Sequence, residues 1–266
     1  MIQTARLGIV FVLPLWVCGC SGNFGEKLAD NSSKKKDQEK ASQPAEAATQ
    51  APVARINSGT HIAAGQMLER QGDFNGAAEQ YEKAVTTDPR QVMGYNRLGI
   101  VYQKMGRVAD ADLIFRQGLS AAPGSAMLHN NLGYNFLQQK KFAEAETSFR
   151  DSLRLQPDFK RARMNLAITL AHQGKYPAGV EEFSKVVPGD VAHFNVAAVC
   201  MQKGDYTQCE RSLKQALAIN PNCPVARDQL QKVSRLAASQ PRNARPAPVQ
   251  PLSPLAGDSS QEPSSP

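Results

Sequence analysis

The histidines and carboxylates are the side chains in this sequence that could bind a metal ion or transfer a proton. The four histidines are His61, His129, His172 and His193. Three of them, His61, His129 and His193, fall at position 4 of the first, third and fifth internal repeats described below, and therefore on separate structural units rather than in one ligand cluster. Carboxylates such as Asp110 are scattered in patterns typical of solvated helix surfaces. There is no phosphate-binding loop, nucleophile elbow or metal-ligand spacing. We expect no catalytic residues, cofactor, bound metal or small-molecule substrate.

Cysteine chemistry is the other candidate, and Cys20 has the most informative context. Arg6 precedes an apolar run at residues 7–16, LGIVFVLPLW, which is too short to span a bilayer and has the length of a signal-peptide core. The sequence VCGC follows and resembles the lipobox of bacterial lipoproteins, although Cys18 stands where Ala or Ser is usual. The resemblance implies a signal peptide at residues 1–19, a diacylglycerol on the Cys20 thiol and an acyl chain such as palmitate on its amino group.

The residue after Cys20 predicts the membrane. Ser21, rather than Asp, follows the lipidated cysteine, and in the sorting pattern of lipoproteins this indicates the outer membrane, with the protein facing the periplasm. The alternative is an ordinary secretory signal and a periplasmic protein without lipid.

Two polar flanks enclose the rest of the chain. Residues 20–57 hold almost no aromatic or branched apolar residues, and residues 238–266 are rich in Pro and Ser. Such segments cannot bury enough apolar surface to fold on their own. We expect a disordered tether after the lipid anchor and a disordered tail at the other end.

The segment between the flanks repeats itself every 34 residues. Pro89, Pro123 and Pro157 keep this step, and so do small residues, alanines and aromatics at three further positions; these are Gly65, Gly99, Gly133, Ala77, Ala111, Ala145, Tyr81, Phe115 and Phe149. The pattern resembles the tetratricopeptide repeat (TPR), a helix pair with a small residue at position 8, Ala at 20, an aromatic at 24 and Pro at 32. The resemblance implies an all-α, right-handed α-solenoid.

Five helix-turn-helix repeats are expected, at residues 58–91, 92–125, 126–159, 160–189 and 190–223, followed by a capping helix at 224–237. The small residue at position 8 should allow the first helix of a repeat (helix A) to approach the Ala at position 20 of the second helix (helix B), with the aromatic side chain of position 24 beside them. The fourth repeat is four residues short and carries Gly179 in place of that Ala. We expect a local kink in the solenoid there.

The A helices of such solenoids line a concave groove, and this implies a set of partner-binding residues. Position 6 carries Asn131, Asn165 and Asn195 in three successive repeats, which resembles the asparagine ladder of O-linked GlcNAc transferase. There, side-chain amides bond to the backbone of an extended peptide. The alternative is that Asn-Leu-Gly is simply common in these repeats. The residues of the two-carboxylate clamp of chaperone adaptors are not present. The remaining predicted groove residues are Arg97, Asn96, Asn130, Tyr134 and Arg161.

Cys200 and Cys209 fall at inward-facing positions of neighbouring helices in the fifth repeat. They could form a disulfide outside the cytoplasm, or remain two small buried thiols.

Charge and the absence of catalytic motifs define the expected class of function. The chain has a formal net charge of +7, but residues 58–223 hold 19 Lys and Arg against 16 Asp and Glu, so only +3 belongs to the repeats. Nucleic acid is therefore not expected as a partner.

We expect a scaffold that binds a protein or peptide at the cell envelope. It resembles the repeat lipoproteins of tight-adherence (Flp) pilus assembly. The alternative is an adaptor that recruits a peptidoglycan hydrolase or protease.

Overall fold

The computed structural model describes residues 57–239, and this part of the chain is built from helices alone. Their order is α1 (Ser58–Gln71), α2 (Phe74–Thr87), α3 (Val92–Lys104), α4 (Val108–Ala121), α5 (Ala126–Gln138), α6 (Phe142–Leu155), α7 (Lys160–His172), α8 (Tyr176–Ser184), α9 (Gly189–Lys203), α10 (Tyr206–Ile219) and α11 (Pro224–Ser239). The prediction of an all-α repeat solenoid is confirmed. The expected cap is α11, which ends at Ser239 rather than at 237.

Side chains and glycines at the helix ends explain why the chain turns where it does. Asn57, Asp73, Ser125 and Asp205 each accept a hydrogen bond from a backbone N–H in the first turn of the helix that follows. Gly72 and Gly204 end α1 and α9 in the left-handed conformation, in which glycine has no steric penalty. Helix pairs therefore form antiparallel hairpins joined by short turns.

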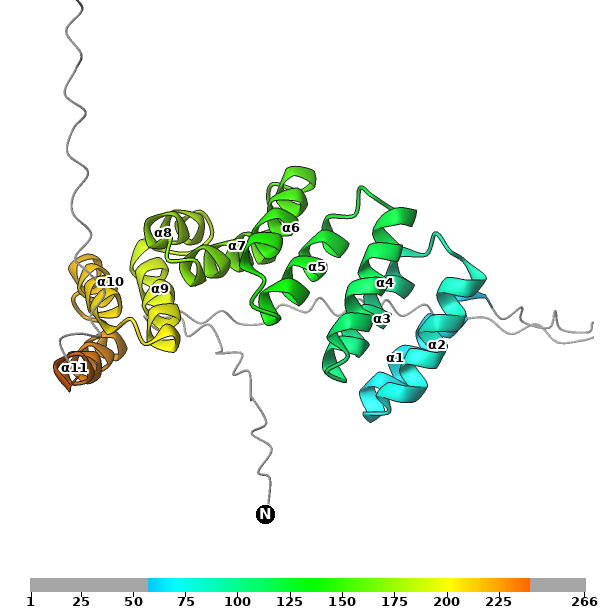
Figure 1. Ribbon diagram of the computed structural model, residues 1–266, viewed down its shortest axis with the longest axis horizontal. Coiled ribbons are helices and arrows are strands. Elements are labelled where there is room, and N and C mark those ends of the chain that lie inside the picture. The colour runs from blue at the N-terminus through cyan, green and yellow to red at the C-terminus, as the bar shows by residue number, and fades with distance from the viewer. Residues whose placement is uncertain (1–56, 240–266) are drawn as a thin grey trace, which may run out of the picture.

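The hairpins stack into an arched array (Figure 1). Each odd-numbered helix from α1 to α7 contacts the next odd-numbered helix, whereas consecutive even-numbered helices have no comparable contact among the described residues. The helices that lie closer together are on the inside of the curve. We call the face formed by α1, α3, α5, α7 and α9 the inner surface, and the face formed by α2, α4, α6, α8 and α10 the outer surface.

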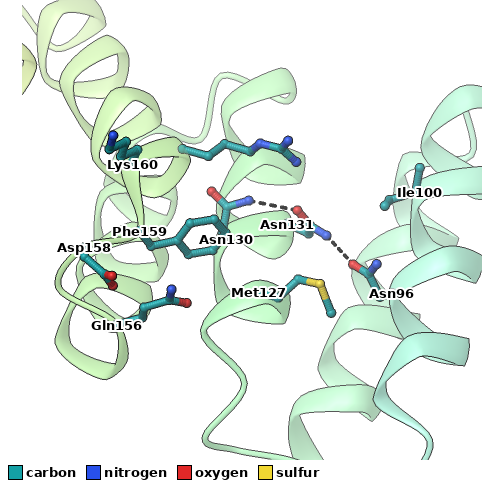
Figure 2. Close-up of a pocket in the computed structure, with 10 residues that line it drawn as sticks. Asn96, Ile100, Met127, Asn130, Asn131, Gln156, Asp158, Phe159 and Lys160 are labelled. Atoms are coloured by element: carbon teal, nitrogen blue, oxygen red, sulfur yellow. Dashed lines mark hydrogen bonds between the residues drawn. The ribbon is translucent and has the colours of Figure 1, made fainter. Parts of the chain in front are cut away.

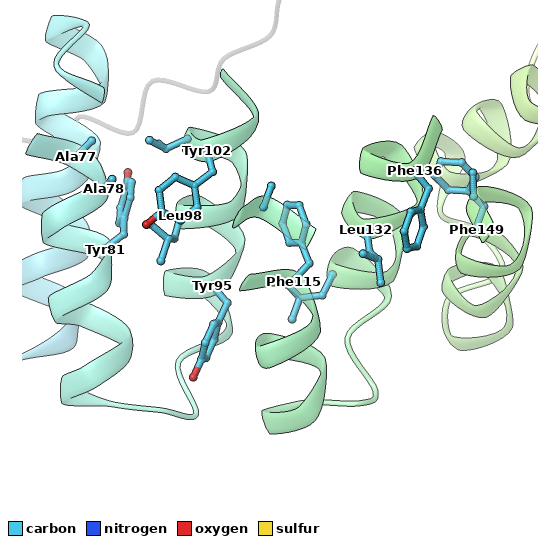
Figure 3. Packing of buried hydrophobic residues seen from close by; sticks show 14 of the residues in the cluster. Ala77, Ala78, Tyr81, Tyr95, Leu98, Tyr102, Phe115, Leu132, Phe136 and Phe149 are labelled. Atoms are coloured by element: carbon cyan, nitrogen blue, oxygen red, sulfur yellow. The ribbon is translucent and has the colours of Figure 1, made fainter. Parts of the chain in front are cut away.

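The hydrophobic core is divided into two clusters. The first runs from Ile62 to Leu170 and contains the fully buried rings of Tyr81, Phe115 and Phe149, which Figure 3 shows within the stacked hairpins. The second runs from Ala167 to Val233. Helix α7 belongs to both, because its leucines pack on the first cluster and its alanines on the second. The array of helices is continuous, but its hydrophobic core is divided at α7, which packs on the first cluster with one set of side chains and on the second cluster with another.

The small residue at position 8 is required by the aromatic ring at position 24. A Cβ atom built on Gly99 would lie 2.3 Å from Cε1 of Phe115, and one on Gly133 would lie 2.8 Å from Cε1 of Phe149. The sequence-based expectation placed the Ala of position 20 as the close neighbour; in the structure the nearest atoms belong to the ring.

The fourth repeat reverses the two small residues. Ala167 stands at position 8 and Gly179 at position 20, and a Cβ on Gly179 would lie 3.0 Å from the carbonyl oxygen of Ala167. The pair of helices thus still has one methyl group between them, contributed from the other side. Helix α8 is also short, at nine residues, and in Figure 1 it is seen close to its axis whereas α2 and α4 are seen from the side. The direction of the hairpins changes along the array around this repeat.

A recurring hydrogen bond fixes the turns between repeats. At the starts of α5, α7 and α11, the side chain at position 4 reaches back to the carbonyl oxygen of the proline near the end of the preceding repeat. His129 contacts Pro123 O at 3.1 Å, and Arg227 donates to Pro221 O at 2.7 Å. Arg163 makes the same contact with Pro157. In these helices the side chain at position 4 therefore helps to hold the preceding inter-repeat turn.

The predicted lipid-attachment site at Cys20, the predicted signal peptide and the two flanks, apart from Asn57, Ala238 and Ser239, lie outside the described residues. Within residues 57–239, no helix has the length and apolar character needed to cross a bilayer.

Candidate functional site

Asparagine side chains join three helices of the inner surface. Asn165 on α7 donates from Nδ2 to Oδ1 of Asn130 on α5, at 3.0 Å. Asn130 donates to Oδ1 of its neighbour Asn131 at 2.9 Å, and Asn131 donates to Oδ1 of Asn96 on α3. Figure 2 shows the last two bonds, which run in a line across the gap between the helices. The four residues form a continuous chain of amide hydrogen bonds, which we call the amide chain.

The amide chain changes the meaning of the predicted ladder. The asparagines bond to one another across repeats, so they hold the spacing of α3, α5 and α7. Asn130 is only 1% exposed and has a packing role. Asn195 does not join the chain: it is 7% exposed, and its Nδ2 is sealed from solvent without a hydrogen-bond partner in the described structure. Asn131 and Asn165 are half-buried, and they remain the amides of the ladder that a partner can reach.

A pocket of about 440 Å³ lies beside the amide chain. Asn96, Asn130 and Asn131 form its polar wall, while Ile100 and Met127 supply apolar surface. Its remaining lining residues come from the α6–α7 turn and the first residues of α7; they are Gln156, Asp158, Phe159, Lys160 and Arg161. Met127, Phe159 and Lys160 surround the hollow in Figure 2. We call this the α5–α7 pocket.

The start of α7 gives the α5–α7 pocket a positive edge. The helix begins without a side-chain cap and has no acidic residue in its first turn. A helix N-terminus carries a partial positive charge, so Lys160 and Arg161 add to it rather than compensate it. Neither of the two forms an ion pair within residues 57–239, and Asp158 is the pocket's one lining carboxylate. The arrangement favours an anionic group at this end.

A second, smaller pocket of about 260 Å³ lies between α1 and α3 and is lined by Gln66, Glu69, Arg70, Arg97 and Lys104. At its centre, Glu69 accepts hydrogen bonds from Lys104 Nζ at 2.6 Å and from the Tyr81 hydroxyl at 2.9 Å. Arg97 Nη1 lies 3.8 Å from the same carboxylate. Burial opposes ionisation of Glu69, but these donors outweigh it and hold the pKa of the carboxyl below its ordinary value. We call this the α1–α3 pocket.

The predicted groove residues are only partly brought together. Asn96, Asn130, Asn131 and Arg161 line the α5–α7 pocket, and Arg97 lines the α1–α3 pocket. Asn165 bonds to the first pocket's wall from behind. Tyr134 packs against the first core cluster and lines neither pocket.

Sequence reasoning missed the other two cations of the α1–α3 pocket, which lie beside Arg97. Arg70 and Lys104 both stand at position 13 of their repeats, an inner position, and that shared position was the signal that could have found them. Met127 was missed although it stands at position 2 of its repeat, the same inner position as Arg161. Phe159 was missed because the turn that brings it to the α5–α7 pocket is not visible in the repeat pattern.

Cys200 and Cys209 are free thiols in the structure, and both are buried. The Cys209 thiol donates to the carbonyl oxygen of Ala197 at 3.2 Å. Burial raises the pKa of both thiols to about 12, which keeps them protonated and unreactive at neutral pH. Of the two alternatives, the structure has the pair of buried thiols.

The histidines are used in packing. His61 hydrogen-bonds Gln80 at 2.9 Å, and the ring of His172 stacks on Phe142 with centroids 5.1 Å apart. Burial, together with the nearby Lys203 and Lys140, lowers the pKa of His172. Within residues 57–239 no group of three or more His, Cys, Asp or Glu side chains is arranged to hold a metal ion.

Sequence comparison agrees with the architecture. Tetratricopeptide repeat profiles match residues 65–106, 96–157, 130–190 and 191–223, which together span more than half of the chain. The chain belongs to the tetratricopeptide repeat family, a fold that supports protein–protein interaction. No curated protein sequence matches it significantly.

Solved structures share this fold at low sequence identity. YrrB, described as a TPR protein with an unusual peptide-binding site, is 20% identical with a TM-score of 0.51, over 66% of this chain and 92% of its own. PilW, described as a widely conserved type IV pilus biogenesis factor, is 22% identical with a TM-score of 0.53, over 68% and 86%. PilF of Pseudomonas aeruginosa is 21% identical with a TM-score of 0.50, over the same shares.

Proposed function

We propose that this protein is a non-catalytic scaffold of the bacterial cell envelope that binds an extended segment of a partner protein on its inner surface. The α5–α7 pocket carries the proposal. It combines apolar surface at Ile100 and Met127 with amides at Asn96 and Asn131, and this is the combination that fits a side chain and the adjacent peptide groups of a bound segment.

Rigidity supports a docking role. The amide chain and the fully buried core beneath it fix the spacing of α3, α5 and α7 before any partner arrives. A preformed groove loses little conformational entropy when a segment binds, so more of the contact energy appears as affinity.

The envelope location rests on the lipobox-like sequence at Cys20. The proposed role is in pilus or secretion-system assembly, and the likeness to PilW, described as a type IV pilus biogenesis factor, supports the first of these. A lipid anchor would keep the groove at one membrane, where a partner passing through the envelope meets it. Cys20→Ser should move the protein out of the membrane fraction or leave it unprocessed; unchanged membrane partition would remove the lipid anchor from the proposal.

Site-specific photocrosslinking in intact cells tests the groove. A benzophenone amino acid in place of Met127, at the α5–α7 pocket, should crosslink an envelope protein that mass spectrometry can identify. The matched control is the same substitution at Leu113, which is 55% exposed on the outer helix α4. Pilus components at position 127 alone would support assembly, and a hydrolase or protease there would support the adaptor role. Equal crosslinking at both positions, or none at 127, would remove the groove from the proposal.

A further inference from the structure

Charge is segregated between the two faces of the array. The five inner helices carry seven Lys or Arg residues against two carboxylates, Glu69 and Asp190. The five outer helices carry six Lys or Arg residues against ten Asp or Glu residues. The inner helices are therefore +5 and the outer helices −4. The small net charge of the repeats is therefore the sum of a positive inner surface and a negative outer surface.

The positive charge of the inner surface is concentrated in two places. In the α1–α3 pocket, Arg70, Arg97 and Lys104 surround one carboxylate and leave two positive charges uncompensated. The Nε of Arg97 is buried there without a hydrogen-bond partner in residues 57–239. A buried guanidinium nitrogen without an acceptor is costly, so the site lacks an acceptor that a ligand could supply.

The second concentration is at the start of α7, where Lys160 and Arg161 edge the α5–α7 pocket. Asn96 and Asn131 of the amide chain lie on the wall of the same pocket, and Arg97 is the neighbour of Asn96 on α3. Two cationic sites thus occur on one face, with amides between them. Arg163, next along α7, is already paired with Glu182 at 2.9 Å and is not available.

We propose that the inner surface selects an extended, acidic polypeptide segment, with one carboxylate at Arg97 in the α1–α3 pocket and another at Lys160 and Arg161 in the α5–α7 pocket. This rests on the proposed function and names the chemistry of its partner. A polypeptide fits better than a nucleic acid. Asn131 and Asn165 match peptide groups. Tyr95, Tyr102 and Phe136 on the inner helices are buried in the core, and Phe159 is the one aromatic residue that lines either pocket, so the two pockets offer no row of rings on which successive bases could stack.

Fluorescence anisotropy with the purified full-length protein tests the selection. The probe is a fluorescein-labelled ten-residue peptide of alternating Glu and Gly, capped at both ends, and its matched control replaces every Glu with Gln. The Glu peptide should bind saturably and weaken as salt rises, and the Gln peptide should bind about tenfold or more weakly, because only the first can pair with the two cationic sites.

Charge-neutral variants locate the binding. Arg97→Gln and Arg161→Gln should each weaken the Glu peptide about threefold or more, since each removes one cation from a separate pocket. Arg211→Gln on the outer helix α10 is the control, because Arg211 is exposed and bonds only to Gln208 among the described residues; it should change affinity less than twofold. Thermal unfolding of each variant checks that the fold is intact, and Arg161 is exposed enough to be replaced without disturbing the core.

Three results would overturn the inference: equal binding of the Glu and Gln peptides, equal losses in the Arg211 and Arg161 variants, or tighter binding of a ten-nucleotide oligothymidylate than of the Glu peptide. Partners still crosslinked at position 127 under any of these results would leave the proposed function in place without its acidic selectivity. Loss of both signals would remove the two together.

Discussion

Five turns show what a single residue contributes to this fold. The turn inside each repeat enters the left-handed region at the same position, which is occupied by Gly72, Gly106, Gly174 and Gly204 in four repeats and by Lys140, with φ 60°, in the third. A side chain with a Cβ is strained there, at a cost of about 1–2 kcal/mol relative to the right-handed region. Lys140 is therefore a residue whose side chain does not suit the backbone conformation that the turn requires.

Lys140→Gly should raise the free energy of unfolding by about 0.5–1 kcal/mol, because relief of the left-handed strain exceeds the added entropy of glycine in the unfolded chain. Urea unfolding followed by circular dichroism measures this change. Gly106→Ala, at the same turn position of the second repeat with φ 74°, should lower stability instead. An unchanged or lower stability of Lys140→Gly would show that the lysine side chain makes a compensating contact.

Within a helix pair, positions 8, 20 and 24 vary together. The first three repeats combine glycine, alanine and an aromatic ring, the fourth exchanges the two small residues, and the fifth combines Ala197, Cys209 and Leu213. A larger residue at position 8 is thus accompanied by a smaller one at 20 or 24. The interior is close-packed, so each added methyl group needs space released elsewhere.

Gly133→Ala tests this coupling. Helix propensity alone predicts a gain of about 1 kcal/mol, but the new Cβ would lie 2.8 Å from Phe149, and we expect a net loss of about 1–3 kcal/mol from overpacking. Combining it with Phe149→Leu should recover part of the loss, because the pair then matches Ala197 and Leu213. The double-mutant cycle is read from unfolding midpoints, and strictly additive losses would mean that the ring and the glycine do not compete for the same space.

The helices could be predicted well from the sequence because glycines, alanines and prolines recur at a fixed step and mark the positions of each repeat. Less of the site could be predicted. Asn131 and Asn165 were identified by position. However, the hydrogen bond that each side-chain amide donates to a neighbouring repeat depends on how far apart successive helices lie. The cations Arg70 and Lys104 were missed because each looks like an ordinary surface residue until α1 and α3 are placed side by side.

At the scale of the whole molecule, charge and stability are both distributed along the array. The net charge of the repeats pointed away from any strongly charged ligand, since it averages two faces of opposite sign. Stability is likewise local: the two core clusters share α7 but hold different helices at either side of it. In a repeat array each unit contacts only its neighbours, so a perturbation should spread through adjacent repeats and fade.

Leu213→Ala makes that expectation measurable. Leu213 is 1% exposed in the second cluster, and its truncation should cost about 2–5 kcal/mol. Hydrogen exchange should then speed up about tenfold or more in α9, α10 and α11 while α1 to α4 change little, because their protection depends on the first cluster. Phe115→Leu, in that first cluster, should give the reverse pattern around α3 and α4. Uniform loss of protection in both variants would show that the two clusters unfold as one cooperative unit. In that case α7 couples the unfolding of the two clusters, and the groove that it helps to form is as rigid as the core beneath it.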